Sequence, residues 1–248
     1  MKKIIFLIPL LFITTSCKKN KNSSALDYEI KLDGTYRVSL STSSKEKNIT
    51  IPKKYNKKDV TEIGGFRNND YIETVKFYEN ITSIEEGSFT YCQNLKTITV
   101  EKSDIYSTIN GSLYKDKELI VYASGKTDSS ITIDANIKSR AFTIAPNLNK
   151  INIKSSVVES NAFVYLENIE EITIYENVDS VSNDFYSGKE LNKLIIKSEK
   201  VSKTIEVKNV KNLYVIENME LSSKTKELYT KVNVEKIDDI VYDVYNLK

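Results

Sequence analysis

Few side chains in this sequence could carry out acid–base or nucleophilic chemistry. Its 248 residues include no histidine, so the commonest general base and the commonest metal ligand are both missing. Three adjacent acidic pairs remain as candidate acid and base couples, and these are Glu85-Glu86, Glu170-Glu171 and Asp238-Asp239. Neighbouring residues of a strand point to opposite faces. We therefore interpret the three pairs as solvated turns and edges rather than as catalytic couples.

The cysteines add no catalytic site. There are two, Cys17 and Cys92, which is too few for a disulfide framework. Cys92 lies inside a recurrent apolar pattern and is expected to be a buried, unreactive thiol; a reactive one would need a basic neighbour, and Lys96 is the only one near in sequence. The chain also lacks a glycine-rich phosphate loop, an EF-hand loop, a CxxC pair and a G-x-S-x-G motif. We expect no enzyme, no metal site and no cofactor.

The first 25 residues predict export. Residues 1–16 join a basic start to an apolar run of about ten residues, which indicates a secretory signal peptide too short to span a bilayer. Cys17 follows directly, and a cysteine at this junction resembles the lipobox of bacterial lipoproteins, where it is the site of lipid attachment. Thr14 stands where that motif prefers leucine, so an ordinary secretory signal is the alternative. Residues 17–25 then form the lipidated cysteine and a flexible tether.

This start predicts where the protein works. Two or more acyl chains hold a protein stably on a membrane, so we expect an extracytoplasmic protein that is lipid-anchored to the bacterial cell membrane or cell surface. Loss of Lys2 and Lys3 with the signal leaves 34 of the 36 basic side chains against 34 acidic ones. A neutral mature chain has no electrostatic footprint for nucleic acid.

The rest of the chain is dominated by a repeat. A short apolar-x-apolar pattern, typical of a strand that faces a core, begins at Ile49, Val75, Ile98, Ile131, Ile151, Ile172, Leu194 and Leu213, with spacings of 26, 23, 33, 20, 21, 22 and 19 residues. Five phenylalanines, each with an apolar residue six positions later, recur between these patterns at Phe66, Phe89, Phe142, Phe163 and Phe185. An apolar ladder with this period predicts a leucine-rich repeat solenoid over residues 49–215.

Three other segments interrupt or end the repeat. Residues 26–48 alternate around Asp33-Gly34, which predicts an N-terminal β-hairpin cap over the first coil, with positive φ at both turn positions. The spacing of 33 residues contains an insertion, 105–122, that predicts a β-hairpin protruding from the stack. Residues 216–248 are expected to form a C-terminal cap or a degenerate repeat.

Specific motifs along the repeat match a known family. They include the Asp-Gly-Thr-Tyr start at residues 33–36, the strand end Ile51-Pro52, the series Phe89, Cys92 and Leu95, and the hairpin residues Gly111, Leu113 and Tyr114. In these motifs residues 26–215 resemble the BspA-type leucine-rich repeat family of bacterial surface proteins. The resemblance implies a right-handed solenoid with a parallel β-sheet on one face and irregular or 3₁₀ returns. It also implies adhesion to host matrix proteins, host cells or other bacteria.

Side chains that alternate with the inward strand residues must point outward, and extended faces are where solenoids bind partners. We therefore predict a binding surface with Tyr78, Tyr175 and Ile195 as anchors. The alternative is a solvated face in which threonine merely favours a strand. The full predicted set is Thr74, Lys76, Tyr78, Thr97, Thr99, Glu101, Lys150, Asn152, Lys154, Glu171, Thr173, Tyr175, Lys193, Ile195 and Lys197.

The inserted segment offers a second candidate surface. Tyr106, Tyr114 and Tyr122 gather there, either as an exposed adhesive patch or as side chains that pack the insertion onto the solenoid. Together these features predict a cell-surface lipoprotein that binds a protein or glycan and so mediates adhesion to host or neighbouring cells. A structural or assembly component of the bacterial envelope, with no host ligand, is the alternative. A degenerate surface antigen is a third interpretation, favoured by the fading C-terminal repeats.

Overall fold

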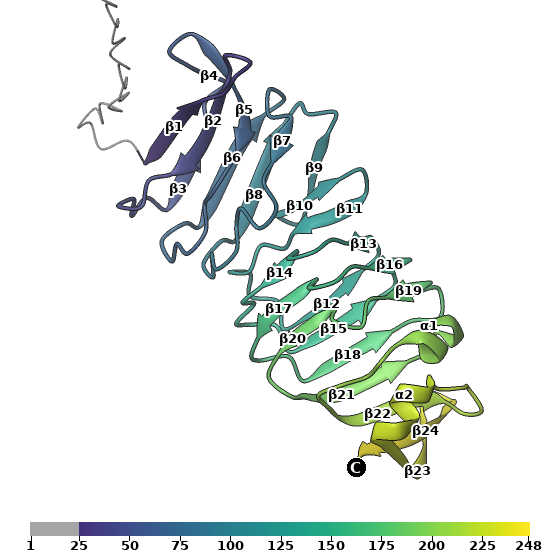
Figure 1. Cartoon of the computed structure of the whole chain (residues 1–248). Coiled ribbons are helices and arrows are strands. Elements are labelled where there is room, and N and C mark those ends of the chain that lie inside the picture. Colours follow the sequence, from purple (N-terminus) through teal and green to yellow (C-terminus); the bar gives the residue numbers. More distant parts are fainter. Residues whose placement is uncertain (1–24) are drawn as a thin grey trace, which may run out of the picture.

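The structure is a computed structural model that describes residues 25–248 and shows an elongated stack of coils (Figure 1). The predicted signal peptide, Cys17 and the predicted tether up to residue 24 lie outside the described residues. The predicted leucine-rich repeat solenoid is confirmed, because each of the eight apolar-x-apolar patterns begins within a strand. These strands are β3 (Asn48–Thr50), β6 (Thr74–Tyr78), β8 (Thr97–Glu101), β12 (Ser130–Ile133), β15 (Lys150–Ile153), β18 (Glu171–Ile174), β21 (Leu191–Ile196) and β22 (Val210–Ile216).

The returns of the coils are more regular than the expected irregular or 3₁₀ segments. Most carry short strands that pair in parallel with the next coil, so that Ile137 is in register with Val158, and Phe142 with Phe163. Coils of nearly equal length bring the same backbone groups side by side, and pairing satisfies them. The short strands are β7 (Ser83–Ile84), β13 (Asn136–Ile137), β14 (Phe142–Thr143), β16 (Val157–Val158), β17 (Phe163–Leu166), β19 (Ser180–Val181) and β20 (Tyr186–Gly188).

The insertion does not protrude from the stack as predicted. Residues 105–122 form an antiparallel meander of β9 (Tyr106–Ile109), β10 (Ser112–Lys115) and β11 (Glu118–Val121), and β11 pairs in parallel with β13. The turn at Asn110-Gly111 lies against β8, where the Gly111 carbonyl accepts a hydrogen bond of 2.8 Å from the Ile98 amide. Leu113 and Leu119 are fully buried, and this burial explains why the meander packs into the stack.

The meander also divides the predicted single parallel sheet in two. Strands β3, β6 and β8 form one sheet, whereas β12, β15, β18, β21 and β22 belong to another. The hydrophobic core is divided at the same place into a first cluster that ends at Leu113 and a second that begins at Leu119. The core therefore consists of two columns joined by the β10–β11 turn.

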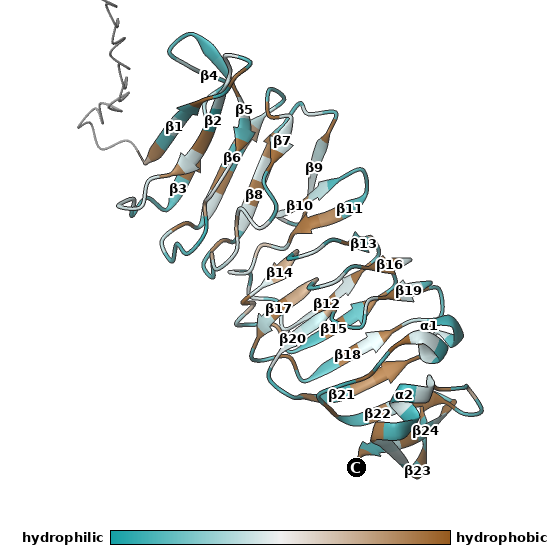
Figure 2. Ribbon diagram, in the orientation of Figure 1, coloured by the Kyte–Doolittle hydropathy of each residue, from teal (hydrophilic) through white to brown (hydrophobic). Residues whose placement is uncertain are grey.

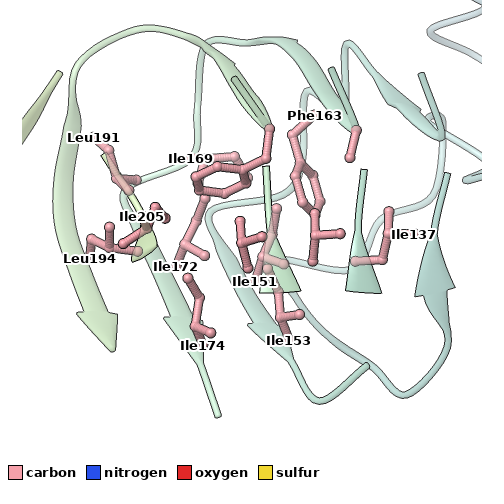
Figure 3. Packing of buried hydrophobic residues seen from close by; sticks show 14 of the residues in the cluster. Ile137, Ile151, Ile153, Phe163, Ile169, Ile172, Ile174, Leu191, Leu194 and Ile205 are labelled. Carbon is pink, nitrogen blue, oxygen red and sulfur yellow. The ribbon is translucent and has the colours of Figure 1, made fainter. Parts of the chain in front are cut away.

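All five repeated phenylalanines are buried, as the pattern predicted. In the first cluster Phe66 and Phe89 lie 5.4 Å apart between ring centroids. In the second, Phe142 lies 4.8 Å from Phe163, and the isoleucines of successive strands point into the same interior (Figure 3). Apolar and polar residues alternate along the ribbon in both halves (Figure 2).

Hairpins cover both ends of the stack. At the N-terminus, β1 (Leu26–Ile30) pairs antiparallel with β2 (Tyr36–Leu40). Strand β2 also pairs in parallel with β5 (Lys58–Ile63), and β5 pairs antiparallel with β4 (Lys54–Tyr55). The turn is longer than the predicted two residues, because Asp33 keeps a negative φ and only Gly34, at +82°, is left-handed. The Asp33 carboxylate instead accepts a hydrogen bond of 2.9 Å from the Thr35 amide.

At the C-terminus, residues 216–248 contain a second hairpin, β23 (Tyr229–Ile237) and β24 (Ile240–Leu247), whose turn is Asp238-Asp239. Strand β24 pairs antiparallel with β22 and so covers the last edge of the parallel sheet. Two short helices, α1 (Glu199–Thr204) and α2 (Ser223–Leu228), replace short strands in the last returns. Within residues 25–248, none of the helices has the length and apolar character needed to cross a membrane.

Candidate binding face

The structure places the predicted outward residues in two groups. The first outer face consists of Thr74, Lys76, Tyr78, Thr97, Thr99 and Glu101 on β6 and β8. The second outer face consists of Lys150, Asn152, Lys154, Glu171, Thr173, Tyr175, Lys193, Ile195 and Lys197, on or directly after β15, β18 and β21. Because the meander lies between the two sheets, the predicted set does not form one continuous surface.

The second outer face is arranged in three rows across its coils. Strand register aligns Lys150 with Glu171 and Lys193, and it aligns Asn152 with Thr173 and Ile195. A third row follows the strand ends, where the Tyr175 amide donates to the Ile153 carbonyl and the Lys197 amide to the Ile174 carbonyl. Residues at the same position of successive coils are about 4.8 Å apart along the stack. Side chains of one row are therefore within reach of one another.

On the first outer face each lysine has a carboxylate partner. Lys76 pairs with Glu101 at 2.5 Å, and nearby Lys53 pairs with Glu79 at 2.6 Å. Both ammonium groups also lie over the Tyr78 ring, 5.2 and 5.4 Å from its centroid. The hydrogen bond to Glu101 raises the pKa of Lys76, and the hydrogen bond from Lys53 lowers the pKa of Glu79. This face is close to electrical neutrality.

The second outer face has a different charge balance. Glu171 lies between Lys150 at 2.6 Å and Lys193 at 3.9 Å. In the third row, Lys154 and Lys197 each lie 4.8 Å from the centroid of the Tyr175 ring. Among residues 25–248, no carboxylate lies within 4.0 Å of either ammonium group. This face presents four lysines and one glutamate.

Two of the three residues in the middle row, Thr173 and Ile195, are not available to a partner as predicted, whereas Asn152 is half-buried. Thr173 is 3% exposed and Ile195 is 7% exposed, so the expectation that Ile195 is an exposed anchor is wrong. Both are short side chains between two rows of longer lysine, glutamate and tyrosine side chains, whose stems cover apolar surface. The other two predicted anchors, Tyr78 and Tyr175, are half-buried and reach the surface.

The tyrosines of the insertion pack inward. Tyr106 is 4% exposed and Tyr122 is 2% exposed, whereas Tyr114 is half-buried against the second core cluster. Tyr122 stacks on Phe142 with 4.5 Å between the ring centroids. The packing alternative is therefore the correct one for Tyr106 and Tyr122, and the insertion presents no patch of three exposed tyrosines.

Cys92 is a buried thiol, as the repeat pattern predicted. Its Sγ donates to the Phe66 carbonyl at 2.9 Å, and burial raises the pKa of the thiol to about 12. A thiol with this pKa is almost fully protonated at neutral pH and is a poor nucleophile. Of the acidic pairs, Asp238-Asp239 forms a turn as expected, and Glu85 pairs with Arg37 and Arg67. The expectation of turns and edges is wrong for Glu170-Glu171, because Glu171 begins the central strand β18. Residues 25–248 contain no group of three or more acidic, cysteine or histidine side chains suited to a metal.

One hollow was not predicted from the sequence. A cavity of about 220 Å³ lies where the meander meets the return of the preceding coil, with Ile84, Tyr106 and Ile120 among its apolar lining residues. Among the charged groups at its rim, Lys138 pairs with Glu159, and Glu86 accepts a hydrogen bond from the Ser139 hydroxyl. Sequence spacing gave no signal for this cavity, because it arises from how the meander docks.

Comparisons with known proteins point to one family. The model of the BspA type leucine rich repeat region matches residues 15–120 and 135–241, in six copies. No curated protein matches the sequence. Several solved structures are similar at low identity. A leucine-rich repeat protein from Eubacterium ventriosum ATCC 27560 aligns over 82% of this chain and 80% of its own, with 14% identity and a TM-score of 0.44.

Two further solved structures belong to proteins described as surface proteins or antigens. A leucine rich cell surface protein from Faecalibacterium prausnitzii A2-165 aligns over 82% of this chain and 92% of its own, with 15% identity and a TM-score of 0.33. The pneumococcal vaccine antigen PcpA aligns over 79% and 93%, with 15% identity and a TM-score of 0.26.

Proposed function

The chain belongs to the BspA-type leucine-rich repeat family, and we propose that it is a cell-surface protein that binds a protein or glycan through its second outer face. The family match supports binding or adhesion in general. The observation that carries the assignment to this face is its unpaired charge: Lys154 and Lys197 flank Tyr175 without a carboxylate partner among the described residues. Rows of side chains on a rigid parallel sheet supply a pre-organised surface.

The proposed role is non-catalytic. The family consists typically of binding proteins, and at the cavity beside the meander Lys138 and Glu159 are held in an ion pair while Glu86 accepts a hydrogen bond from Ser139. The one free cysteine among them, Cys92, is buried and protonated. Binding is thus the function that these side chains support best.

We propose further that Cys17 carries the lipid anchor. Residue 25 and the C-terminal hairpin lie at opposite ends of the stack, so an anchor just before residue 25 would leave the C-terminal coils farthest from the membrane (Figure 1). Metabolic labelling with palmitate tests this proposal in the natural host. Cys17→Ser should abolish the label and release the protein into the medium. Unchanged labelling would contradict the anchor, whereas an unlabelled wild-type protein would indicate an ordinary secretory signal.

The binding proposal is tested with the mature protein on arrays of matrix proteins and glycans, beside envelope fractions of the producing bacterium. The triple charge reversal Lys150→Glu, Lys154→Glu, Lys193→Glu should weaken binding to the array by about tenfold or more, because several charged contacts are reversed. The control reverses three exposed lysines away from this face, Lys200, Lys208 and Lys224. Equal binding by both variants would contradict the assignment. Retention by the envelope fractions alone would favour a structural component.

A further inference from the structure

We propose that the Lys154–Tyr175–Lys197 row binds an anionic polysaccharide, a chain of sugars bearing sulfate or carboxylate groups. This inference rests on the proposed function, since it names the ligand class of the second outer face. The three residues come from neighbouring coils, with Tyr175 on the coil between those of the two lysines. Each ammonium group lies 4.8 Å from the centroid of the ring.

The ring holds the two lysines in place for an anion. A cation over an aromatic face is attracted by the ring quadrupole, so both side chains are partly ordered before a ligand arrives. Their backbone positions are two coils apart, which is roughly 9–10 Å along the stack. Two anionic groups on successive parts of a linear polymer can therefore each meet one ammonium group.

Charge distinguishes this row from a similar one in the other half. Lys53 and Lys76 also flank a tyrosine, Tyr78, but both are neutralised by glutamates. On the same face, the row Lys150–Glu171–Lys193 adds two further lysines and only one carboxylate, that of Glu171. The second outer face thus keeps an excess of positive charge, and a polyanion gains from each neutralised lysine.

The surroundings favour a polysaccharide over an acidic protein. Protein interfaces usually have an apolar core with buried aromatic anchors. Here the only apolar outward side chain of the predicted set, Ile195, is covered, and the exposed groups are ammonium, amide, carboxylate and phenol.

The test measures binding of the mature chain to dextran sulfate and to polygalacturonate, with neutral dextran and poly-glutamate as comparison polymers. The wild-type protein should bind both polyanionic sugars, more weakly as salt rises. Lys154→Gln, Lys197→Gln should weaken this binding by about tenfold, the size expected for losing two exposed charged contacts. Preference between the two sugars identifies the anionic group.

The matched control is Lys47→Gln, Lys96→Gln. These lysines also stand two coils apart and the variant removes the same charge, but both are paired with Glu73, at 2.6 and 2.8 Å. Its binding should change by less than about twofold. Equal losses in the two variants would show a general charge effect and overturn the proposal. So would absence of binding to both sugars, or equally tight binding of poly-glutamate.

The tyrosine supplies a second readout. Tyr175→Phe keeps the aromatic ring, so this variant should bind the polyanions as the wild type does. Tyr175→Leu keeps both lysines but removes the ring that orders their side chains, so it should weaken binding by about threefold. Unchanged binding by the leucine variant would show that the ring does not order the two lysines for binding. If polyanion binding fails while the triple charge reversal still abolishes array binding, the ligand class is wrong and the proposed function stands.

Discussion

The two halves of the solenoid use one repeat geometry to make two electrically different faces. Each half places a tyrosine just where a strand ends, with the ammonium groups of two lysines over its ring. In the first half the residue in register with Tyr78 on the next coil is Glu101. In the second half the residue that follows Tyr175 on the next coil is Lys197. The residue type at this register position is thus one of two differences that make the first row neutral and the second cationic, and the other is the pairing of Lys53 with Glu79.

The halves also differ in their cores. The first column runs from Leu26 to Leu113 and the second from Leu119 to Tyr229, with the meander between them. In a stack each coil contacts mainly its neighbours, so stability is close to a sum of local terms. We expect a core change in one half to act mainly on that half.

The largest effect should come from Phe142→Ala. Phe142 is fully buried, and its ring lies 4.5 Å from Tyr122 and 4.8 Å from Phe163, so truncation should cost about 3–5 kcal/mol of unfolding free energy. Native-state hydrogen exchange should show lost protection in β15 and β18 and much less change in β3 and β6. Phe66→Ala is the mirror control. Equal loss throughout the chain in both variants would mean that the two columns unfold as one unit.

A smaller effect is expected at the junction of the halves. A Cβ atom added at Gly125 would lie 2.4 Å from the carbonyl carbon of Asn94, so Gly125→Ala must push two backbones apart. Overpacking of this kind costs about 1–3 kcal/mol. Gly65→Ala is the control, because an added Cβ there meets nothing within 4 Å. Chemical denaturation of both variants should give a lower midpoint for Gly125→Ala than for Gly65→Ala. Similar midpoints would show that the junction is not tightly packed.

The helical return of the second half supplies a third test. The Ser198 hydroxyl donates to the Val178 carbonyl at 2.6 Å and accepts from the Val201 amide at 3.2 Å, at the start of α1. Ser198→Ala removes a buried cap and should cost about 1–2 kcal/mol, measured by thermal unfolding. The exposed Ser223→Ala should be nearly neutral. Equal shifts in the two variants would contradict the role of this cap.

The smallest effect concerns acid stability in the first half. Hydrogen bonds from Lys47 and Lys96 lower the pKa of Glu73 from 4.5 to about 2. Because the folded-state pKa is depressed, the stabilisation is present above about pH 4.5 and is lost as pH falls toward 2. Glu73→Gln should make the free energy of unfolding depend less steeply on pH between about pH 4.5 and 2. The change should be small, because the paired groups are exposed to solvent. Glu176→Gln should leave it unchanged. Identical acid curves for wild type and Glu73→Gln would contradict the bridge.

Much of the fold could be predicted because core positions repeat. The apolar positions of Ile151 and Ile153 and the phenylalanine position of Phe163 recur once per coil. Side chains that recur with this period face the interior of the stack. The meander was harder to place. Its turn at Asn110-Gly111 predicts a hairpin, but only tertiary packing decides that Leu113 and Leu119 enter two separate columns.

The candidate face could be predicted in part. Alternation shows which side chains point outward, whereas exposure also depends on the length of the neighbours in adjacent coils. Ile195 is covered for this reason. Charge pairing depends on coil register, which the sequence leaves open by one or two residues. The contrast between Tyr78 and Tyr175 therefore emerged only from the structure.

The central claim is that binding takes place on the second outer face, and a lysine footprint tests it most directly. The mature protein is acetylated briefly in two states, free in solution and bound to the immobilised ligand of the array. Mass spectrometry then measures the extent of acetylation at each lysine. The account predicts protection of Lys154 and Lys197 and unchanged labelling of Lys47 and Lys96. Protection of the latter pair alone, or no protection on β15, β18 and β21, would contradict it.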